Sequence, residues 1–459
     1  MHPNSFLHRH DTIVALSTPS GVGALGVVRL SGAEAIAIAD RFFSLPLRQS
    51  PSHSARVGLW QRASGQTLDE VVLTLYRAPH SFTKENTVEI SCHGSPFILQ
   101  QLIQDCLEAG ARLATPGEFT QRAYLNGRMD LAQAEAVADL IASESEAAHR
   151  LAIQQLRGGF SQKIRDLREE FVRLAALLEL ELDFAEEDVE FADRALFQEQ
   201  VARLETALRE MADSFALGNA LKNGVPVAIV GKPNAGKSTL LNALLEEEKA
   251  IVSNIPGTTR DTIEDEKVIQ GIRFRFIDTA GLRETDDLIE KIGVERAKAK
   301  IQTARIILYL YDAQNEAQTE AIAQAQALQA ERPDAYVLLL ANKVDVFARF
   351  DLFLPKGLDG LAISARERKG LEQLTNRLYQ QVQAAQTQDV LVSNMRHYES
   401  LQNTRQALHR VAASLERGLS TEMVASDVRE ALYHLGHITG EVSNEDLLDH
   451  IFSKFCIGK

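Results

Sequence analysis

The chain has 459 residues, of which 45% are hydrophobic and 24% charged, and its formal net charge at pH 7 is −14. This length and composition are typical of a globular protein with several domains. The acidic balance argues against a protein that binds nucleic acid over its whole surface. The cysteines Cys92, Cys106 and Cys456 form no CxxC pair and predict a reducing cytoplasm. No segment has about 18 consecutive apolar residues, so no membrane partner is expected.

The sequence pattern changes several times along the chain. Residues 11–122 mix short apolar runs with Gly, Pro and Ser turns, and residues 130–222 and 390–452 repeat apolar residues at helical spacing. Residues 223–381 alternate strand and helix patterns, as in a parallel α/β sheet. We therefore predict a multidomain protein with an α+β N-terminal domain over 1–122, an all-α domain in two halves over 123–222 and 382–459, and an α/β domain inserted at 223–381.

A phosphate-binding loop lies between a strand-like run and a helix-like run. The string Gly231-Lys-Pro-Asn-Ala-Gly-Lys-Ser238 follows the β-branched run 225–230 and precedes the apolar run 239–245. Its glycines allow a tight turn whose N–H groups face an anion. Lys237 can reach the outer phosphates, and the Ser238 hydroxyl can ligate Mg²⁺. The inserted domain is therefore predicted to be a P-loop domain.

Three further motifs follow in the order that a Ras-like GTPase requires. Asp278-Thr-Ala-Gly281 ends an apolar run, where an Asp can hold Mg²⁺ through water and the Gly N–H can face the γ-phosphate. Asn342-Lys-Val-Asp345 ends another run, and the Asp345 carboxylate can accept two N–H donors of guanine that adenine lacks. Ser364-Ala365 fits the loop that backs the base. These motifs predict an open α/β sheet that binds GTP at the carboxyl ends of its strands.

Three positions bear on the mechanism of hydrolysis. The stretch 255–262 contains Gly-Thr-Thr-Arg-Asp, in which a Thr can ligate Mg²⁺ only while the γ-phosphate is bound, as in a switch segment. Leu282 stands where Ras-type enzymes have a glutamine that orients water, which leucine cannot do. Asn234 offers an amide oxygen to a monovalent cation. We hypothesise that K⁺ there supplies the charge that an arginine finger supplies elsewhere.

Over nearly its whole length the chain resembles the family of the tRNA-modification GTPase MnmE, also called TrmE. The resemblance rests on the GTPase motifs and on further strings, which include Asp11-Thr-Ile-Val-Ala15, Gly26-Val-Val-Arg-Leu-Ser-Gly32, Pro116-Gly-Glu-Phe-Thr120, Asp130-Leu-Ala-Gln-Ala-Glu-Ala136 and the terminal Phe455-Cys-Ile-Gly-Lys459. Era-type GTPases share the nucleotide motifs but lack the N-terminal strings and this tail. At two positions the chain departs from the family pattern, since Arg128 replaces a Lys and Lys84 replaces a common Gly.

The resemblance implies a cytoplasmic homodimer with a folate-binding N-terminal domain and an FAD-containing partner, MnmG. Together they would add a (carboxymethyl)aminomethyl group to C5 of the wobble uridine U34 of certain tRNAs, with a 5-formyl or methylene tetrahydrofolate derivative as cofactor. K⁺-dependent dimerisation of the GTPase domains would activate hydrolysis. The basic residues of the helical segments are scattered among acidic ones, as on a solvated face, so tRNA contact is expected mostly through the partner. The alternative is a ribosome-assembly GTPase of the Era-like class.

The resemblance also implies a residue set for each ligand. Mg²⁺ is assigned to Ser238 and Thr259, K⁺ to Asn234, Ser253, Ile255 and Thr258, and folate to Arg29, Glu89, Arg128 and Lys459. The catalytic assignments are Glu290, Arg283 and Cys456, of which Glu290 matches a glutamate that positions water and Cys456 serves tRNA modification. The residues assigned to GTP are Asn234, Ala235, Gly236, Lys237, Ser238, Thr239, Ser253, Asn254, Ile255, Pro256, Gly257, Thr258, Thr259, Asp278, Thr279, Ala280, Gly281, Asn342, Lys343, Val344, Asp345, Ser364, Ala365 and Arg366.

Overall fold

The structure is a computed structural model that describes residues 11–183, 194–246, 265–278, 301–384, 390–417 and 419–458. The chain forms two compact units. The first unit comprises Met1–Ala138, Gln155–Val201 and Asn403–Lys459, and the second comprises Asp139–Gln154 and Ala202–Gln402. The limits of the units fall within helices, so the domain boundaries predicted at 122, 222 and 381 stay predictions.

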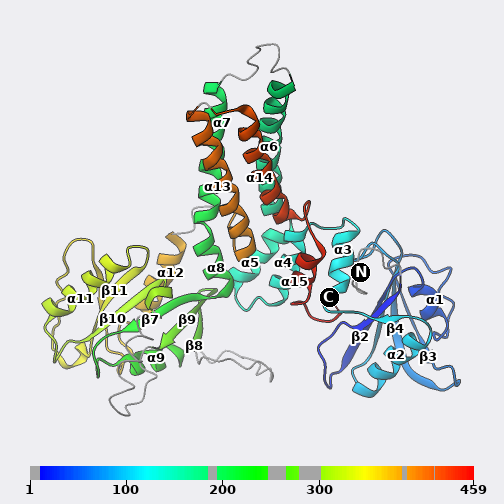
Figure 1. The fold of residues 1–459 in the computed structure, drawn as a ribbon. Coiled ribbons are helices and arrows are strands. Elements are labelled where there is room, and N and C mark those ends of the chain that lie inside the picture. The colour runs from blue at the N-terminus through cyan, green and yellow to red at the C-terminus, as the bar shows by residue number, and fades with distance from the viewer. Residues whose placement is uncertain are drawn as a thin grey trace, which may run out of the picture. The chain divides into compact units, whose positions relative to one another are not determined.

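The first unit contains a six-stranded sheet in the order β3-β4-β5-β2-β1-β6 (Figure 1). Its elements are β1 (Ile13–Leu16), β2 (Leu25–Ser31), α1 (Ala35–Asp40), β3 (Ser54–Gln61), β4 (Thr67–Tyr76), β5 (Thr87–His93), α2 (Pro96–Glu108), β6 (Arg112–Leu113) and α3 (Glu118–Leu125). Because side chains alternate along a strand, Val28 and Ile90 are buried in the core that α1 and α2 complete. Arg29 and Glu89 lie opposite each other in the register of β2 and β5, on the other face of the sheet.

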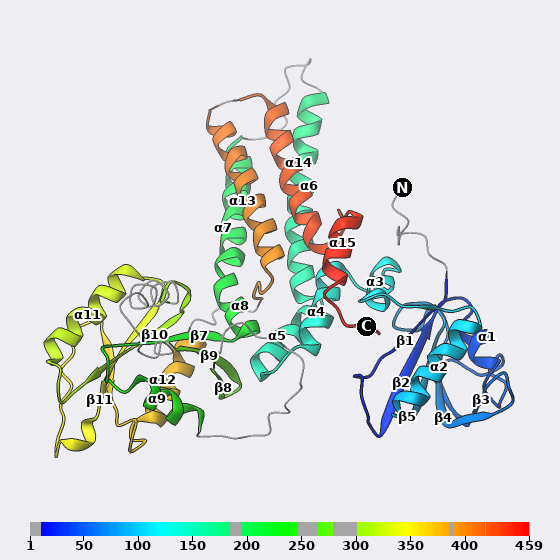
Figure 2. The same cartoon turned by 60° about the horizontal axis from the view of Figure 1, so that its bottom comes forward.

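Long helices with regular apolar stripes complete the first unit. The helices after α3 are α4 (Leu131–Ile141), α5 (Glu146–Leu156), α6 (Gly159–Asp183), α14 (Thr421–Thr439) and α15 (Glu445–Phe452), of which α4 and α5 extend across a limit between the units. The buried apolar residues of α6 recur at intervals of four and three, and they are Phe160, Ile164, Leu167, Phe171, Leu174 and Leu178. The buried residues of α14 include Val424, Val428, Ala431, Leu435 and Ile438. Such stripes pack against each other, and α6 and α14 lie side by side in Figures 1 and 2.

The second unit is built on a six-stranded sheet in the order β12-β11-β10-β7-β9-β8. Its elements are α8 (Phe215–Asn223), β7 (Val225–Val230), α9 (Lys237–Leu245), β8 (Asp265–Ile269), β9 (Ile272–Asp278), β10 (Ile306–Asp312), α11 (Gln318–Glu331), β11 (Tyr336–Asn342), the 3₁₀ helix η3 (Val344–Val346), β12 (Asp359–Ala362) and α12 (Leu371–Ala384). Neighbouring strands are parallel except for β8, which is antiparallel to β9. Apolar residues of α9 and α12 pack on one face and those of α11 on the other, so β10 is buried at every position.

The predicted fold class is confirmed. An α+β part, a helical part and an α/β sheet with a phosphate loop after β7 occur in the predicted chain order (Figures 1 and 2). The helices α7 (Arg194–Asp213) and α13 (Met395–Glu416) each contribute residues to both units. Across the described residues, no helix combines the length and apolarity needed to cross a membrane.

Candidate nucleotide site and N-terminal cavity

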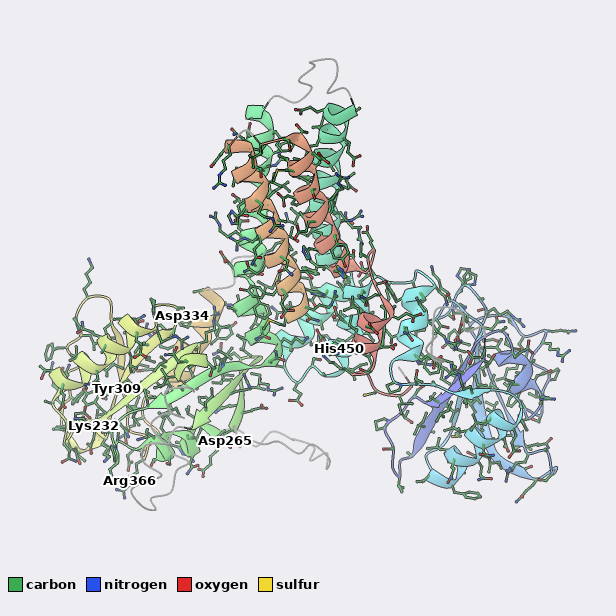
Figure 3. The ribbon with its side chains drawn as sticks, viewed as in Figure 1. Lys232, Asp265, Tyr309, Asp334, Arg366 and His450 are labelled. Carbon is green, nitrogen blue, oxygen red and sulfur yellow. The ribbon has the colours of Figure 1, made fainter. Side chains whose placement is uncertain are left out.

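The predicted nucleotide motifs meet at one edge of the sheet of the second unit. The phosphate loop follows β7, Asn342-Lys-Val-Asp345 begins at the end of β11, and Ser364-Ala365 follows β12. Because these strands are parallel within one sheet, their carboxyl ends share an edge. Figure 3 shows Lys232 of the phosphate loop and Arg366 on one side of this sheet, whereas Asp334, which precedes β11, lies on the other.

The phosphate loop takes its shape from backbone angles that few residues adopt. Gly231 has a φ of 153°, Asn234 of 61° and Gly236 of 98°. A Cβ atom at Gly231 would lie 2.0 Å from the Leu310 carbonyl oxygen, and one at Gly236 would lie 2.3 Å from the Asn342 Nδ2. Only glycine fits these two positions. Left-handed residues in such a loop turn successive N–H groups toward one point at the start of α9, where they can bind an anion.

The buried side chain of Asn342 connects two loops of the site. Its Nδ2 donates to the Ala235 carbonyl oxygen at 2.8 Å, and its Oδ1 accepts from the Ala365 N–H at 3.0 Å. The side chain is only 2% exposed, so water does not compete for either bond. Asn342 therefore fixes the loop predicted to hold phosphates relative to the loop predicted to back the base.

Two lysines are held at the phosphate loop. Lys237 Nζ donates to two carbonyl oxygens at the start of the loop, at 2.8 and 2.9 Å. Lys343 Nζ donates to the Asn234 carbonyl oxygen at 2.9 Å and to Asp312 Oδ2 at 2.7 Å. Burial would raise the pKa of Asp312, but the hydrogen bond from Lys343 brings it below its ordinary value. The sequence-based prediction missed Asp312, although an Asp at the end of the apolar run that forms β10 was a signal for it.

Asp345, the predicted acceptor for guanine, has a hydrogen-bond donor beside it in the predicted base loop. A hydrogen bond from the Ser364 side chain lowers the pKa of Asp345 below its ordinary value. Ser364 itself is fully buried, and its backbone N–H and carbonyl oxygen both pair with Lys369. At neutral pH the Asp345 carboxylate therefore accepts hydrogen bonds and donates none, as the N–H donors of guanine require.

Part of the predicted site lies outside the described residues. These residues are Ser253, Asn254, Ile255, Pro256, Gly257, Thr258, Thr259, Thr279, Ala280, Gly281, Leu282, Arg283, Glu290 and Lys459. The backbone of Asp278 ends β9 and pairs in register with Ile229 of β7. The chain therefore leaves β9 from the same edge of the sheet as the phosphate loop.

A cavity of about 430 Å³ lies in the first unit. Its lining residues are His53, Tyr76, His80, Ser81, Phe82, Thr87, Glu89 and Arg128. Both Nε and Nη2 of Arg29 contact Glu89 Oε1, at 2.9 and 2.8 Å. The guanidinium carbons of Arg29 and Arg128 each lie 5.8 Å from the centre of the Phe82 ring. The structure thus brings Arg29, Glu89 and Arg128 together, and their assignment to folate stays a prediction.

The C-terminal tail reaches this group of residues. The Gly458 carbonyl oxygen accepts hydrogen bonds from Arg29 Nη1 at 3.4 Å and from Ser17 Oγ at 3.3 Å. A Cβ atom at Gly458, which has a φ of 94°, would lie 2.1 Å from the Leu16 carbonyl oxygen, so the approach of the tail requires glycine. The Cys456 side chain is exposed, and its carbonyl oxygen accepts from the Gly117 N–H at 3.4 Å.

The structure accommodates the two departures from the family pattern. Lys84 has a φ of 59°, which explains why glycine suits this position, and its Nζ donates to the Gly127 carbonyl oxygen at 2.8 Å. Arg128 donates to the Ser81 carbonyl oxygen at 2.7 Å. The charged groups of Lys84 and Arg128 therefore each have a backbone carbonyl oxygen as hydrogen-bond acceptor.

Comparisons with known proteins place the chain in a family. The model of the MnmE helical domain matches residues 131–456, and the model of the GTP-binding protein TrmE N-terminus matches residues 12–128. The tRNA modification GTPase MnmE of Cytophaga hutchinsonii is 51% identical to this chain, and the match spans 100% of this chain and 100% of that protein. The chain belongs to the MnmE family. The MnmE of Flavobacterium johnsoniae is 50% identical over 98% of this chain and 99% of that protein, and the MnmE of Porphyromonas gingivalis is 47% identical over 99% and 100%.

Membership of the MnmE family confirms the predicted resemblance and the prediction of a GTPase of tRNA modification. The family models divide the chain near residue 130, between α3 and α4. A solved structure of Aquifex aeolicus Era bound to GDP.AlF4− is 29% identical over 40% of this chain and 66% of that chain, with a TM-score of 0.27, which is too low for a structural conclusion.

Proposed function

We propose that the protein hydrolyses GTP within a complex that modifies C5 of the wobble uridine U34 of certain tRNAs. MnmG, which contains FAD, is the proposed partner, and a tetrahydrofolate derivative supplies one carbon of the (carboxymethyl)aminomethyl group. The main support is that Asn342 joins the phosphate loop to the predicted base loop. The same chain also has a cavity in its N-terminal part, beside the ion pair of Arg29 with Glu89. The protein acts as a homodimer in the cytoplasm in this proposal.

The nucleotide part of the proposal gives each residue a separate role. N–H groups of the phosphate loop and Lys237 bind the phosphates, and Asp345 accepts from the guanine edge. Ser238, at the start of α9, and Thr259 are the proposed protein ligands of Mg²⁺, which neutralises charge on the phosphates when bound. Glu290 positions the attacking water in this proposal, and Arg283 assists hydrolysis.

K⁺ is the proposed source of the extra positive charge in hydrolysis. The Asn234 side chain is exposed in the phosphate loop and has no hydrogen-bond partner among the described residues, so its amide oxygen can bind a cation. Ser253, Ile255 and Thr258 complete the proposed site, and dimerisation of the GTPase domains shields it from water. Rates of phosphate release in matched K⁺ and Na⁺ buffers test this step. Equal rates would refute the role of K⁺ and leave the GTPase assignment intact.

Folate is the proposed ligand of the N-terminal cavity. The variant Arg29→Ala removes the charged hydrogen-bond donor that pairs with Glu89 of the cavity lining, and such a bond is worth about 1.5–3 kcal/mol. We therefore expect about tenfold weaker binding of 5-formyltetrahydrofolate or more, measured by calorimetry on the full chain. GTP hydrolysis should not change. Arg41→Ala is the matched control, because Arg41 is an arginine of the same unit that donates to the Ala109 carbonyl oxygen in an exposed bond. Unchanged folate affinity in Arg29→Ala would contradict the assignment.

Cys456 is proposed to act in tRNA modification and not in GTP hydrolysis. Its side chain is exposed in the tail that contacts Arg29 through Gly458. Because serine keeps the size of cysteine but forms no thiolate, Cys456→Ser should lower wobble-uridine modification by about tenfold or more. Phosphate release should stay at the wild-type rate, and Ser453→Ala in the same tail should change neither. Full modification by Cys456→Ser would rule this role out.

Mass spectrometry of tRNA nucleosides from cells that lack the protein tests the function as a whole. We expect loss of the modified wobble uridine and its return when the wild-type chain is supplied. Normal wobble uridines in the deletion would overturn the proposal. The alternative function, ribosome assembly by an Era-like GTPase, predicts a ribosomal RNA ligand and no binding of folate. The cavity beside the Arg29–Glu89 pair favours the first function.

A further inference from the structure

The two-residue turn between β8 and β9 has an unusual backbone. Gln270 and Gly271 both have positive φ, of 48° and 80°, and the flanking residues Ile269 and Ile272 pair directly with each other. Two consecutive residues with positive φ are typical of a tight type I′ hairpin turn. Glutamine is not favoured in this conformation, so the shape of the turn comes with a local cost.

The tip of this hairpin caps helix α5. The Gly271 carbonyl oxygen accepts a hydrogen bond from the Ala147 N–H at 2.9 Å. Ala147 lies in the first turn of α5, where N–H groups have no acceptor within the helix. A Cβ atom at Gly271 would lie 3.0 Å from Glu146 Oε2 and 3.1 Å from Glu146 Cβ, so the turn and the helix are in close contact.

Arg273 reinforces this contact with a double ion pair. Its Nη1 donates to Glu144 Oε2 at 2.6 Å, and its Nη2 donates to Glu266 Oε1 at 2.7 Å. Glu144 precedes α5, and Glu266 belongs to β8. The Arg273 side chain is 15% exposed and that of Glu266 is 23% exposed, so solvent screens this pair weakly, whereas Glu144 is 58% exposed and its pair with Arg273 is screened more. One guanidinium thus joins both strands of the hairpin to the start of α5, and all these residues belong to the second unit.

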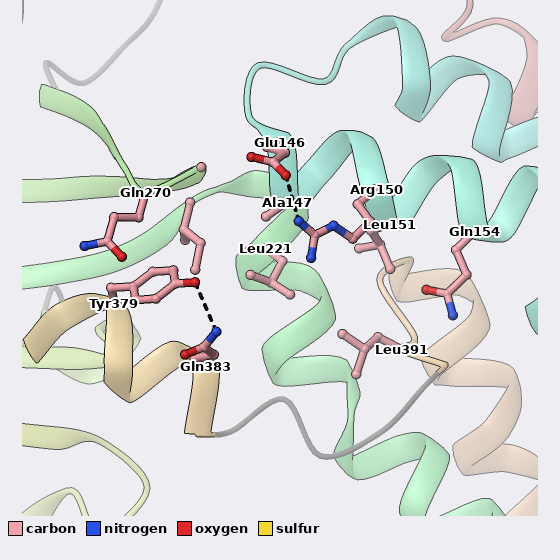
Figure 4. A pocket seen from close by; sticks show the side chains of 12 residues that line it. Glu146, Ala147, Arg150, Leu151, Gln154, Leu221, Gln270, Tyr379, Gln383 and Leu391 are labelled. Carbon is pink, nitrogen blue, oxygen red and sulfur yellow. Dashed lines mark hydrogen bonds and ion pairs between the residues drawn. The ribbon is translucent and has the colours of Figure 1, made fainter. Parts of the chain in front are cut away.

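The turn of the hairpin touches the start of α5 closely, but a small cavity lies next to this contact. A cavity of about 100 Å³ is lined by residues of α5, α8, α12 and the turn, including Leu151, Leu221, Gln270 and Tyr379 (Figure 4). On the α12 side, Gln270 Nε2 donates to Asn376 Oδ1 at 2.7 Å. Close-packed interiors resist displacement. Ile272 of the hairpin and Leu151 of α5 both line this void and belong to one hydrophobic core, and a packed core transmits strain between the elements that share it.

The sequence connects this hairpin to both predicted nucleotide-sensing segments. β8 begins directly after 247–264, which contains the Gly-Thr-Thr-Arg-Asp string, and β9 ends at Asp278, directly before Thr279-Ala280-Gly281. We propose that Arg273 is a positioning residue that couples the nucleotide state of the GTPase to helix α5, through the Gly271 cap on Ala147. This inference rests on the proposed function. α5 continues to Leu156.

The experiment compares GDP and GDP with aluminium fluoride on the full-length protein. Hydrogen exchange in peptides covering 144–150 should differ between the two states by about fivefold or more in the wild type, since coupling energies between sites correspond to such factors. In Arg273→Ala this difference should vanish, and wobble-uridine modification should fall by about tenfold. Phosphate release should stay within about threefold of wild type, because Arg273 lies outside the nucleotide motifs.

Matched variants separate coupling from loss of structure. Arg349→Ala removes another ion-paired arginine of the same unit, whose partner Asp351 is exposed, and should behave as wild type. Glu144→Gln changes a side chain that is 58% exposed and should reproduce the effect of Arg273→Ala with little loss of stability. The double variant should be no worse than either single one, because both act through one contact.

Three outcomes would overturn the inference: equal exchange with both ligands in the wild type, full tRNA modification by Arg273→Ala, or additive effects in the double variant. If the wild type hydrolyses GTP and modifies tRNA while α5 does not respond, only the coupling role fails. If the wild type neither hydrolyses GTP nor modifies tRNA, the proposed function fails, and the coupling role fails with it.

Discussion

Replacing Asn342 by alanine is expected to lower the affinity for GTP by about 100-fold or more. The substitution leaves the Ala235 carbonyl oxygen and the Ala365 N–H without their partner. Each buried polar group without a partner costs about 1–3 kcal/mol, and about 1.4 kcal/mol corresponds to a tenfold change in affinity. If the loops separate to reach water instead, the sites for the phosphates and the base lose their relative position. Titration with a fluorescent GTP analogue measures the loss.

The control for this experiment is Asn223→Ala. Asn223 is an exposed asparagine of the same unit whose Nδ2 donates to Asn219 Oδ1, so its loss should leave GTP affinity unchanged. Asn342→Asp is a second informative variant, because it keeps an acceptor for Ala365 but sets a carboxylate oxygen against the Ala235 carbonyl oxygen. It should therefore also bind GTP poorly. Wild-type affinity in Asn342→Ala would show that other contacts fix the two loops.

Replacing Asp345 by asparagine is expected to change the base preference of the site from guanine to xanthine. The carboxylate accepts two N–H donors of guanine, whereas an amide presents one acceptor and one donor. The new donor faces a donor of guanine but matches the carbonyl group that xanthine has at that position. We expect GTP affinity to fall by about 10³-fold or more, because a donor set against a donor leaves both groups without a partner in the bound complex. Xanthosine triphosphate should bind better than GTP in a competition titration.

Asp351→Asn is the matched control for Asp345→Asn. Asp351 is an exposed aspartate of the same unit whose described partner is Arg349, and it lies outside the nucleotide motifs. This variant should prefer GTP as the wild type does. A loss of GTP binding by Asp345→Asn without any gain for xanthosine triphosphate would show that Asp345 maintains the loop through Ser364 rather than reading the base.

Local sequence patterns were sufficient to predict the fold class. The apolar residues of α6 recur at intervals of four and three, and residues 306–311 of β10 are a continuous run of aliphatic and aromatic residues. These periods depend only on the geometry of a helix or a strand, so a short window of sequence reveals them. The order of the nucleotide motifs at strand ends then indicated a parallel sheet with its ligand at one edge.

Some features of the site could not be predicted from such patterns. The place of Asp312 at the end of an apolar run was a signal in the sequence, but its partner Lys343 could not be predicted from that run. Arg273 resembles a solvated strand residue until Glu144, which is 129 positions away, is seen beside it. Neither residue belongs to a motif, because each depends on a contact between segments that are far apart in the sequence.

The sequence by itself determined the family, the fold class and the class of nucleotide, because these depend on residue types at short, fixed spacings. Only the tertiary structure decided that Asn342 joins the phosphate loop to the base loop, that the C-terminal tail meets Arg29, and that a hairpin tip caps α5. The hydrogen-bond partners in these contacts are chosen by packing. The free energy of a contact at long range depends on the whole fold that brings its two sides together, so no local window of sequence contains it.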